Sequence, residues 1–171
     1  MTGSAVVSRG GSFDGAEPRG VSPGEFPLWD GPLALLNRDL AATLPDHGPL
    51  RLLAVPSLGL DEPEDVYVAL ANGEWHGNRL YPESAHDAVL APAVVADAAQ
   101  ETVTERLWRA WPLCAEHDLG MHPRADTERI LSWWCAGGGT HGDPGHIRAA
   151  VGALDTLIRP RRPNRKKRRP S

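Results

Sequence analysis

Two short segments that contain Cys and His constrain the fold of this chain more than any other feature. Cys114-Ala-Glu-His117 follows a proline, and Cys135 is followed by a Gly-rich loop that leads to His141 and His146. Zinc in proteins prefers four tetrahedral ligands drawn from thiolate and imidazole, and two ligands separated by two residues in a tight turn can reach one ion. The spacing therefore predicts a structural zinc site formed by Cys114, His117, Cys135 and either His141 or His146.

The same residues allow two other interpretations. Cys114 and Cys135 could be buried thiols in a metal-free core of Trp side chains, or they could form a disulfide. The chain has no apolar run of the roughly 18 residues that span a bilayer and no signal-peptide pattern at its N-terminus, so we expect a cytoplasmic protein with no membrane contact. In a reducing cytosol, thiols and metal ligands are more common than disulfides.

The residues between the two pairs add to the zinc interpretation. Residues 118–124 and 129–134 have the pattern of two short strands joined by a polar turn at 125–128. Cys114-x2-His117 followed by Asp118-Leu-Gly-Met121 resembles the first knuckle of a zinc ribbon, Cys-x2-Cys-Gly-x2-Leu, with His in place of the second Cys. Trp134-Cys135 resembles the start of the second knuckle, but no ligand stands three residues after Cys135. The resemblance covers residues 111–154 and implies a zinc-ribbon-like hairpin.

The order of the motifs along the whole chain is similar to that of small uncharacterised proteins of GC-rich bacteria. The composition has the same character, because Ala, Gly and Pro are abundant and sixteen Arg stand against two Lys. This resemblance implies no activity.

Weaker local signals define the N-terminal half. Residues 1–25 show no hydrophobic period and are mostly Gly, Ser, Pro and charge, so we expect them to be disordered. Apolar spacing predicts a helix at 32–44, with Pro32 at its first position and Pro45 after its end. Residues 50–55 predict a strand. Two β-prone runs, 65–70 and 74–80, flank Asn72-Gly73 and predict a hairpin with a type I′ turn.

An Ala-rich segment predicts a longer amphipathic helix at 92–110, which Pro112 would end. One face carries Ala96, Ala99, Val103, Leu107 and Ala110, and the other carries Asp97, Gln100, Glu101, Thr104 and Glu105. Four Trp follow closely, so we expect the densest core among Trp108, Trp111, Trp133 and Trp134.

Together these elements predict an α+β fold. Antiparallel hairpins pack with one long Ala-rich amphipathic helix and a C-terminal zinc-ribbon-like hairpin, and both termini are disordered. The expected organisation is a disordered segment at 1–25, an α+β region at 31–110, a zinc-ribbon-like region at 111–158 and a disordered basic tail at 159–171.

The charge of the chain is strongly divided. Its net charge is −4, yet the tail holds eight of the 18 basic residues and no acid, which leaves ten basic and 22 acidic residues and a charge of −12 on the rest. The tail could bind nucleic acid, remain solvated or fold back on the acidic body. Its basic residues are Arg159, Arg161, Arg162, Arg165, Lys166, Lys167, Arg168 and Arg169. No aromatic residue stands among them, so base stacking is not indicated.

These observations favour a zinc-stabilised, non-enzymatic interaction module with an unknown protein partner. One alternative is a small zinc-dependent hydrolase with an open coordination position, in which Glu116 or Asp143 would be the general base. The other is a nucleic-acid-associated protein that acts through its tail. The chain has no HExxH, GxSxG or P-loop motif, and we expect His122 to face solvent.

Overall fold

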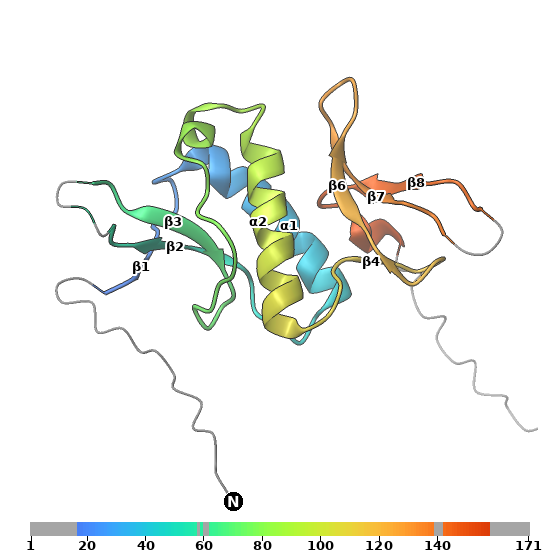
Figure 1. Ribbon diagram of the computed structural model, residues 1–171, viewed down its shortest axis with the longest axis horizontal. Coiled ribbons are helices and arrows are strands. Elements are labelled where there is room, and N and C mark those ends of the chain that lie inside the picture. Colours follow the sequence, from blue (N-terminus) through green and yellow to red (C-terminus); the bar gives the residue numbers. More distant parts are fainter. Residues whose placement is uncertain (1–16, 58, 60–61, 139–141, 158–171) are drawn as a thin grey trace, which may run out of the picture.

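The computed structural model describes residues 17–57, 59, 62–138 and 142–157. In this part of the chain, two helices and three small antiparallel sheets form an α+β fold. Helices α1 (Pro27–Thr43) and α2 (Ala91–Leu107) pack against each other at the centre, with the sheet β1–β2–β3 on one side and the sheet β6–β7–β8 on the other (Figure 1). The predicted α+β class is confirmed. Both helices have 17 residues, so the predicted single long helix is not observed.

Helix α1 begins earlier than the sequence predicted. Pro27 lies in its first turn, where the missing N–H costs nothing, and Pro32 lies inside the helix. The buried positions Trp29, Leu33, Leu36 and Leu40 follow a helical period and belong to the same hydrophobic core as buried residues of α2 and of the sheets. The helix ends as predicted, because Leu44 is its C-cap and Pro45 follows.

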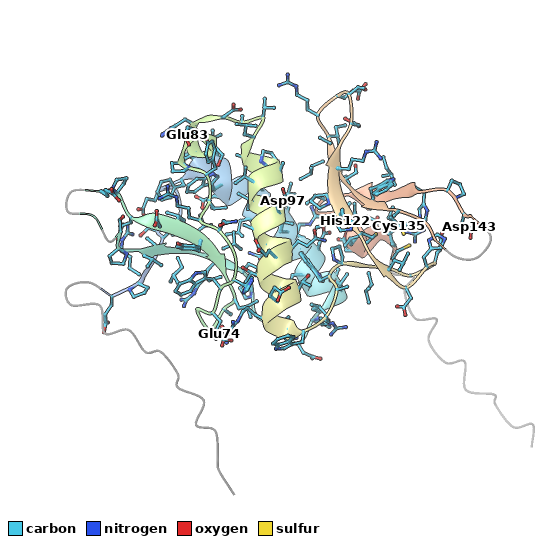
Figure 2. All side chains as sticks on the ribbon, in the orientation of Figure 1. Glu74, Glu83, Asp97, His122, Cys135 and Asp143 are labelled. Carbon is cyan, nitrogen blue, oxygen red and sulfur yellow. The ribbon has the colours of Figure 1, made fainter. Side chains whose placement is uncertain are left out.

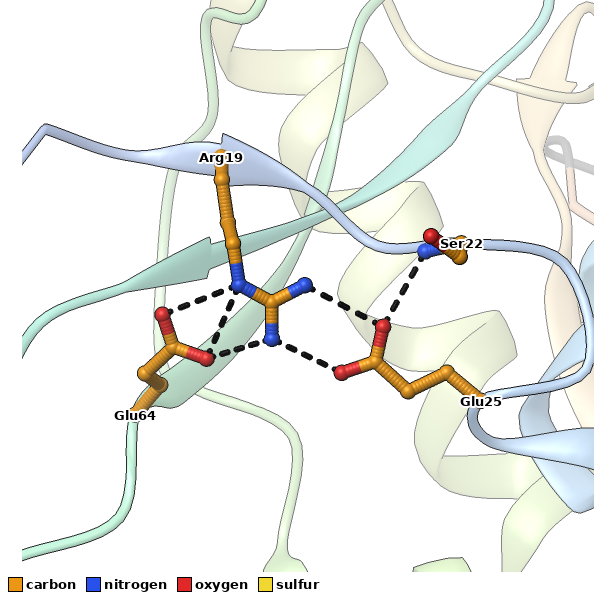
Figure 3. Close-up of polar contacts among 4 residues, drawn as sticks. All are labelled: Arg19, Ser22, Glu25 and Glu64. Carbon is orange, nitrogen blue, oxygen red and sulfur yellow. Dashed lines mark hydrogen bonds and ion pairs between the residues drawn. The ribbon is translucent and has the colours of Figure 1, made fainter.

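The first sheet has the order β1 (Arg19–Gly20), β2 (Arg51–Val55) and β3 (Asp65–Ala69). Strand β1 lies in the segment that we expected to be disordered, so that prediction is wrong for residues 17–25. Arg19 pairs with Ala54 in the ladder, and its guanidinium donates hydrogen bonds to the carboxylates of Glu25 and Glu64 (Figure 3). These contacts tie the N-terminal segment to the start of α1 and to β3.

The predicted hairpin at 65–80 is largely wrong. Strand β3 pairs along its length with β2, and after the Asn72-Gly73 turn only one isolated bridge, between Ala69 and Trp75, continues the pairing. Gly73 has a φ of 90°, whereas Asn72 does not have a positive φ, so the turn is not type I′. The Gly73 N–H donates to the Leu70 carbonyl at 2.9 Å, as in a type I turn that is followed by a left-handed glycine.

Helix α2 buries one face and ends at Leu107, before Pro112, which was predicted to end it. Trp108 caps the helix in the left-handed conformation, with a φ of 52°. Ala96, Ala99 and Val103 are fully buried, while the carboxylates of the opposite face remain exposed. The short 3-10 helix η1 (Pro82–His86) precedes α2 and packs on both helices.

The C-terminal part contains two further sheets. Strands β4 (Leu113–Cys114) and β5 (Leu119–Gly120) form a small hairpin. Strands β6 (His122–Ala125) and β7 (Leu131–Cys135) form the predicted pair around the predicted turn, and β8 (His146–Ala150), which we did not predict, joins β7 on its other side. The 3-10 helix η2 (Leu154–Leu157) then packs on α1.

The Trp-rich core forms only in part as predicted. Trp111 and Trp133 are buried and meet edge to face with ring centroids 5.5 Å apart. Trp134 is half-buried beneath the guanidinium of Arg124. Trp108 is 88% exposed, so its assignment to the core is wrong. The left-handed cap points this side chain away from the helix pair.

A buried carboxylate that the sequence did not mark connects α1 to the C-terminal sheet. Asp39 is fully buried and accepts hydrogen bonds from the indole N–H of Trp133 at 2.6 Å and from the backbone N–H groups of Gly152 and Leu154 at 2.6 and 2.8 Å. A buried carboxylate needs such donors to offset the loss of hydration. Asp39 therefore fixes β7 and the segment after β8 on α1.

The remaining terminal predictions lie outside the described residues. They concern disorder at 1–16 and the basic tail at 159–171, and the candidate ligand His141 falls in another segment that is not described. Among the described helices, none is both long enough and apolar enough to cross a bilayer.

Candidate metal centre

Four of the predicted ligands come together between the β4–β5 hairpin and the β7–β8 pair. One donor atom from each of Cys114, His117, Cys135 and His146 lies within 4.8 Å of every other. Cys114 and Cys135 are fully buried free thiols, and the two imidazoles are half-buried. The disulfide interpretation is therefore not observed. The four residues lie close enough to hold a metal ion.

Three of the sulfur–nitrogen distances in the cluster have the length of a tetrahedral edge around a zinc ion. Cys114 Sγ lies 3.7 Å from His117 Nδ1 and 3.7 Å from His146 Nε2, and Cys135 Sγ lies 3.5 Å from His117 Nδ1. Zn–S bonds of about 2.3 Å and Zn–N bonds of about 2.0–2.1 Å give a tetrahedral S–N edge of about 3.6 Å. The sulfur–nitrogen distances agree with this edge to within about 0.1 Å.

The first pair is set by the turn between β4 and β5. The Cys114 sulfur accepts hydrogen bonds from the backbone N–H groups of Glu116 and His117, and the Asp118 N–H closes the turn on the Cys114 carbonyl at 2.8 Å. Asp118 has a φ of 55°. Asp tolerates this left-handed conformation better than most residues, although Gly adopts it at the lowest cost.

The second pair is set by strand register. Cys135 and His146 are direct partners in the antiparallel ladder of β7 and β8, so their side chains emerge on the same face. Two glycines allow the loop between them to close. A Cβ on Gly137, whose φ is 70°, would lie 2.3 Å from the Asp143 carbonyl oxygen, and a Cβ on Gly145 would lie 2.6 Å from the Trp134 ring.

Carboxylates surround the two imidazoles. His117 turns Nδ1 towards both sulfurs, and its Nε2 lies 3.6 Å from Asp143 Oδ2. His146 Nε2 lies 3.6 Å from Glu116 Oε2, and Glu116 is also bonded to Arg148. A carboxylate on the ring nitrogen that does not bind the metal commonly orients a ligand imidazole and strengthens it as a donor. Asp143 has this position at His117, whereas Glu116 lies beside the same nitrogen of His146 that faces Cys114. Figure 2 shows Asp143 on the loop side of Cys135.

Electrostatics at the cluster favour a thiolate at Cys114. Burial opposes ionisation, but hydrogen bonds from the backbone N–H groups of Glu116 and His117 and from the side chains of His117 and Cys135 lower the pKa of Cys114 to about 6. The hydrogen bond to Cys114 raises the pKa of His117, and Asp143 adds to this effect. Burial raises the pKa of Cys135, as does the neighbouring Cys114. The first thiol therefore ionises well before the second.

The candidate residue His122 lies apart from the cluster. His122 is exposed on β6, as predicted. Glu116 and Asp143, which we considered only as general bases, lie beside the ligand imidazoles, a position that the sequence does not predict. Strand β8 was also not predicted. The turn residues Asp143-Pro-Gly before Ile147 and Val151 were the one signal that could have marked this strand.

The fold and the cluster together define an α+β protein with a closed group of two Cys and two His that can hold a metal ion. Comparison of the chain with protein-family models, with curated proteins and with solved structures finds no match. The geometry of the cluster therefore carries the functional argument.

Proposed function

We propose that this chain is a zinc-stabilised, non-enzymatic interaction module in which Cys114, His117, Cys135 and His146 hold one structural zinc ion. The observation that carries the proposal is the set of two thiols and two imidazoles within 4.8 Å, with sulfur–nitrogen edges of 3.5–3.7 Å. Two thiolates with two imidazoles in a tetrahedron is a ligand set typical of zinc.

A closed ligand set supports a structural role over a catalytic one. Catalytic zinc sites keep three protein ligands and leave the fourth position for water or substrate, whereas structural sites use four protein ligands. The carboxylates that a hydrolase would need as general bases have other contacts, because Asp143 faces His117 and Glu116 is bonded to Arg148. A hydrolytic reaction would require one of the four ligands to leave.

The local geometry also supports the resemblance of residues 111–154 to a zinc ribbon. Backbone N–H groups donate to both sulfurs, from Glu116 and His117 to Cys114 and from Gly137 to Cys135. Asp118 takes the left-handed conformation at the position where the ribbon knuckle carries Gly. We interpret this part of the chain as a zinc-ribbon-like unit in which the second ligand pair comes from neighbouring strands.

Exposed apolar side chains at the end of α2 and on the hairpin that holds Cys114 support a role in binding a partner. Trp108 is 88% exposed, and Leu113 and Leu119 on the β4–β5 hairpin are 40% and 41% exposed. Exposed aromatic residues commonly dominate the free energy of protein–protein binding. Because the same hairpin holds Cys114, the metal would fix the shape of this surface.

Metal stoichiometry tests the zinc site directly. The full chain is purified without added metal or an affinity tag and its mass is measured under native conditions, together with the variants Cys114→Ser, Cys135→Ser, His146→Ala and His141→Ala. His122→Ala is the matched control, because His122 is exposed on β6 and lies outside the cluster. We expect one zinc in the wild type, His141→Ala and His122→Ala proteins, and none in the other three variants.

The structural role has a separate readout. Structural zinc contributes on the order of 10 kcal/mol of binding free energy in small modules. We therefore expect Cys114→Ser, or a chelator, to unfold the β4–β8 region, which NMR amide dispersion would detect. A metal-free protein with the wild-type melting temperature would refute the proposal. Hydrolysis of simple esters that a chelator abolishes without unfolding would establish the hydrolase instead.

A further inference from the structure

A groove beside α2 carries a row of carboxylates that the zinc site does not use. It lies between α2 and the β5–β6 segment and has a volume of about 290 Å³. Trp111 and Met121 contribute apolar surface, and Asp97, Glu101 and Glu105 of α2 line the groove, with the Glu101 carboxylate also close to Gly77. Figure 2 shows Asp97 on α2 and His122 on the strand that faces it. Among the residues that the structure describes, no Arg or Lys lines this groove.

The three carboxylates repel one another where they stand. They occupy positions i, i+4 and i+8 of one helix face, where like charges destabilise the helix. Glu105 also lies in the last turn, next to the negative end of the helix dipole. Burial raises the pKa of Asp97, against the effect of His122, and the charge of Glu101 raises it further. Among the described residues, none of the three forms an ion pair within 4 Å.

The arrangement suits separated cations rather than one ion. Among the described residues, the only group of donor atoms close enough to share a metal ion is the Cys and His cluster. Carboxylates four residues apart on a helix are displaced by about 6 Å along its axis. Alternate residues of an extended chain are spaced by about 6.6 Å. An extended segment with a cation at every second position therefore matches the row.

The chain contains one segment with this pattern. Its last residues carry Arg165, Lys166, Lys167, Arg168 and Arg169 in succession, so either set of alternate residues is fully cationic. The tail from residue 159 has a charge of +8 and the rest of the chain −12. The eight residues from 158 to Arg165, where the continuous basic run begins, can extend over about 26 Å. This reach is comparable to the length of helix α2, about 25 Å.

We infer that the C-terminal basic tail docks in the groove beside α2, where its Arg and Lys side chains pair with Asp97, Glu101 and Glu105. The docked tail relieves the repulsion along the α2 face. It also occupies the cationic residues that would otherwise contact nucleic acid, so docking and nucleic-acid binding exclude each other. The inference goes beyond the zinc proposal and does not depend on it.

A zero-length crosslink tests the docking in the full, zinc-saturated chain. A carbodiimide joins a carboxylate to an amine only when the two are in contact, and the only two Lys of the chain are Lys166 and Lys167. We expect monomeric products in which these two Lys are linked mainly to Asp97, Glu101 or Glu105. The yield should fall several-fold between about 0.1 and 1 M salt, because the screening length shortens from about 10 to about 3 Å.

The rate of trypsin cleavage in the tail gives a second test. Unlike the crosslink, it leaves the carboxylates chemically unmodified. The groove variant combines Asp97→Asn, Glu101→Gln and Glu105→Gln. The matched control combines Asp46→Asn, Glu83→Gln and Glu128→Gln, which removes three exposed carboxylates elsewhere and changes the net charge equally. We expect cleavage after the tail Arg and Lys residues to be about tenfold faster in the groove variant and unchanged in the control.

Several results would overturn the inference. Crosslinks spread over all exposed carboxylates, crosslinks only between chains, or no crosslinks would each show that the tail does not dock in this groove. Equal cleavage rates in the wild type and the groove variant would show the same. Equal affinities of the groove and control variants for duplex DNA would show that docking does not prevent the tail from binding nucleic acid.

Discussion

Replacement of Asp39 by Ala should destabilise the protein strongly, because the carboxylate is fully buried and accepts three hydrogen bonds. Its loss leaves the indole N–H of Trp133 and the backbone N–H groups of Gly152 and Leu154 without an acceptor. A buried donor without a partner costs about 1–3 kcal/mol, and a water in the vacated space can satisfy one of them. We expect Asp39→Ala to lower the free energy of unfolding by about 3–5 kcal/mol, a large share of the roughly 5–15 kcal/mol of a typical domain.

Graded variants make this test specific. Asp39→Asn keeps one acceptor oxygen but turns an amide N–H₂ towards a donor, so we expect a loss of about 2 kcal/mol. Trp133→Phe removes one donor and should cost about 1–2 kcal/mol. Asp155→Asn is the control, because Asp155 is exposed and should cost less than about 0.5 kcal/mol. The assay is urea unfolding of the zinc-saturated protein by circular dichroism. A loss below about 1 kcal/mol for Asp39→Ala would refute the reasoning.

Three further predictions concern the metal site. Zinc binding displaces any proton still held by its ligands, and the pKa is about 6 at Cys114 but raised above the usual value at Cys135 and at His117. The logarithm of zinc affinity, measured by chelator competition, should therefore rise by about one per pH unit near pH 8, from Cys135 alone, and more steeply at lower pH, where His117 and then Cys114 are also protonated. Asp118→Gly should leave the melting temperature unchanged or higher, whereas Asp118→Val should cost about 1–2 kcal/mol, because a branched side chain is strained at a φ of 55°. Gly137→Ala should speed zinc release in a chelator chase, because the added carbon would clash with the Asp143 carbonyl oxygen. Gly142 has a similar φ of 67° but no described residue within 4 Å of the added carbon, so Gly142→Ala should cost only the backbone strain of about 1 kcal/mol.

The metal ligands could be predicted because their chemistry depends on residue type and local spacing. Cys114 and His117 stand in one tight turn, and their separation alone indicates a shared ion. The fourth ligand could not be chosen, since His141 and His146 both follow a Gly-rich loop whose path the sequence leaves open. The ladder of β7 and β8 brings His146 opposite Cys135, and that register depends on tertiary contacts.

The hairpin prediction failed because a local turn signal says nothing about competing strands. Asn72-Gly73 does form a turn, but β2 takes the whole length of β3. On the other edge of β3, the Leu80 N–H donates to the Val66 carbonyl and the Thr102 hydroxyl donates to the Val68 carbonyl. These contacts replace a regular second strand. They come from segments up to 34 residues away, which pattern analysis over a short window does not see.

The start of α1 illustrates a different difficulty. Pro27 and Pro32 both suit the first turn of a helix, and the apolar pattern after Pro32 looks complete by itself. The earlier start is favoured by Trp29, which is buried and donates a hydrogen bond from its indole to Ser84 of η1 at 2.9 Å. Asp39 was overlooked for a similar reason, because an acid on a helix is normally solvated. Only the folded chain shows its three donors.

The zinc site and the helical core are coupled through two Trp side chains. Trp133 lies two residues before Cys135 on β7 and is bonded to Asp39, while Trp111 lies three residues before Cys114 and donates to the Thr43 hydroxyl at 2.9 Å. Both ligand-bearing strands are therefore anchored to α1. Coupling between two sites is reciprocal. If Asp39→Ala destabilises the zinc-bound protein more than the metal-free protein, zinc affinity must fall by the corresponding factor, about tenfold for each 1.4 kcal/mol of difference. Equal destabilisation of the two forms would show that α1 does not position the ligands.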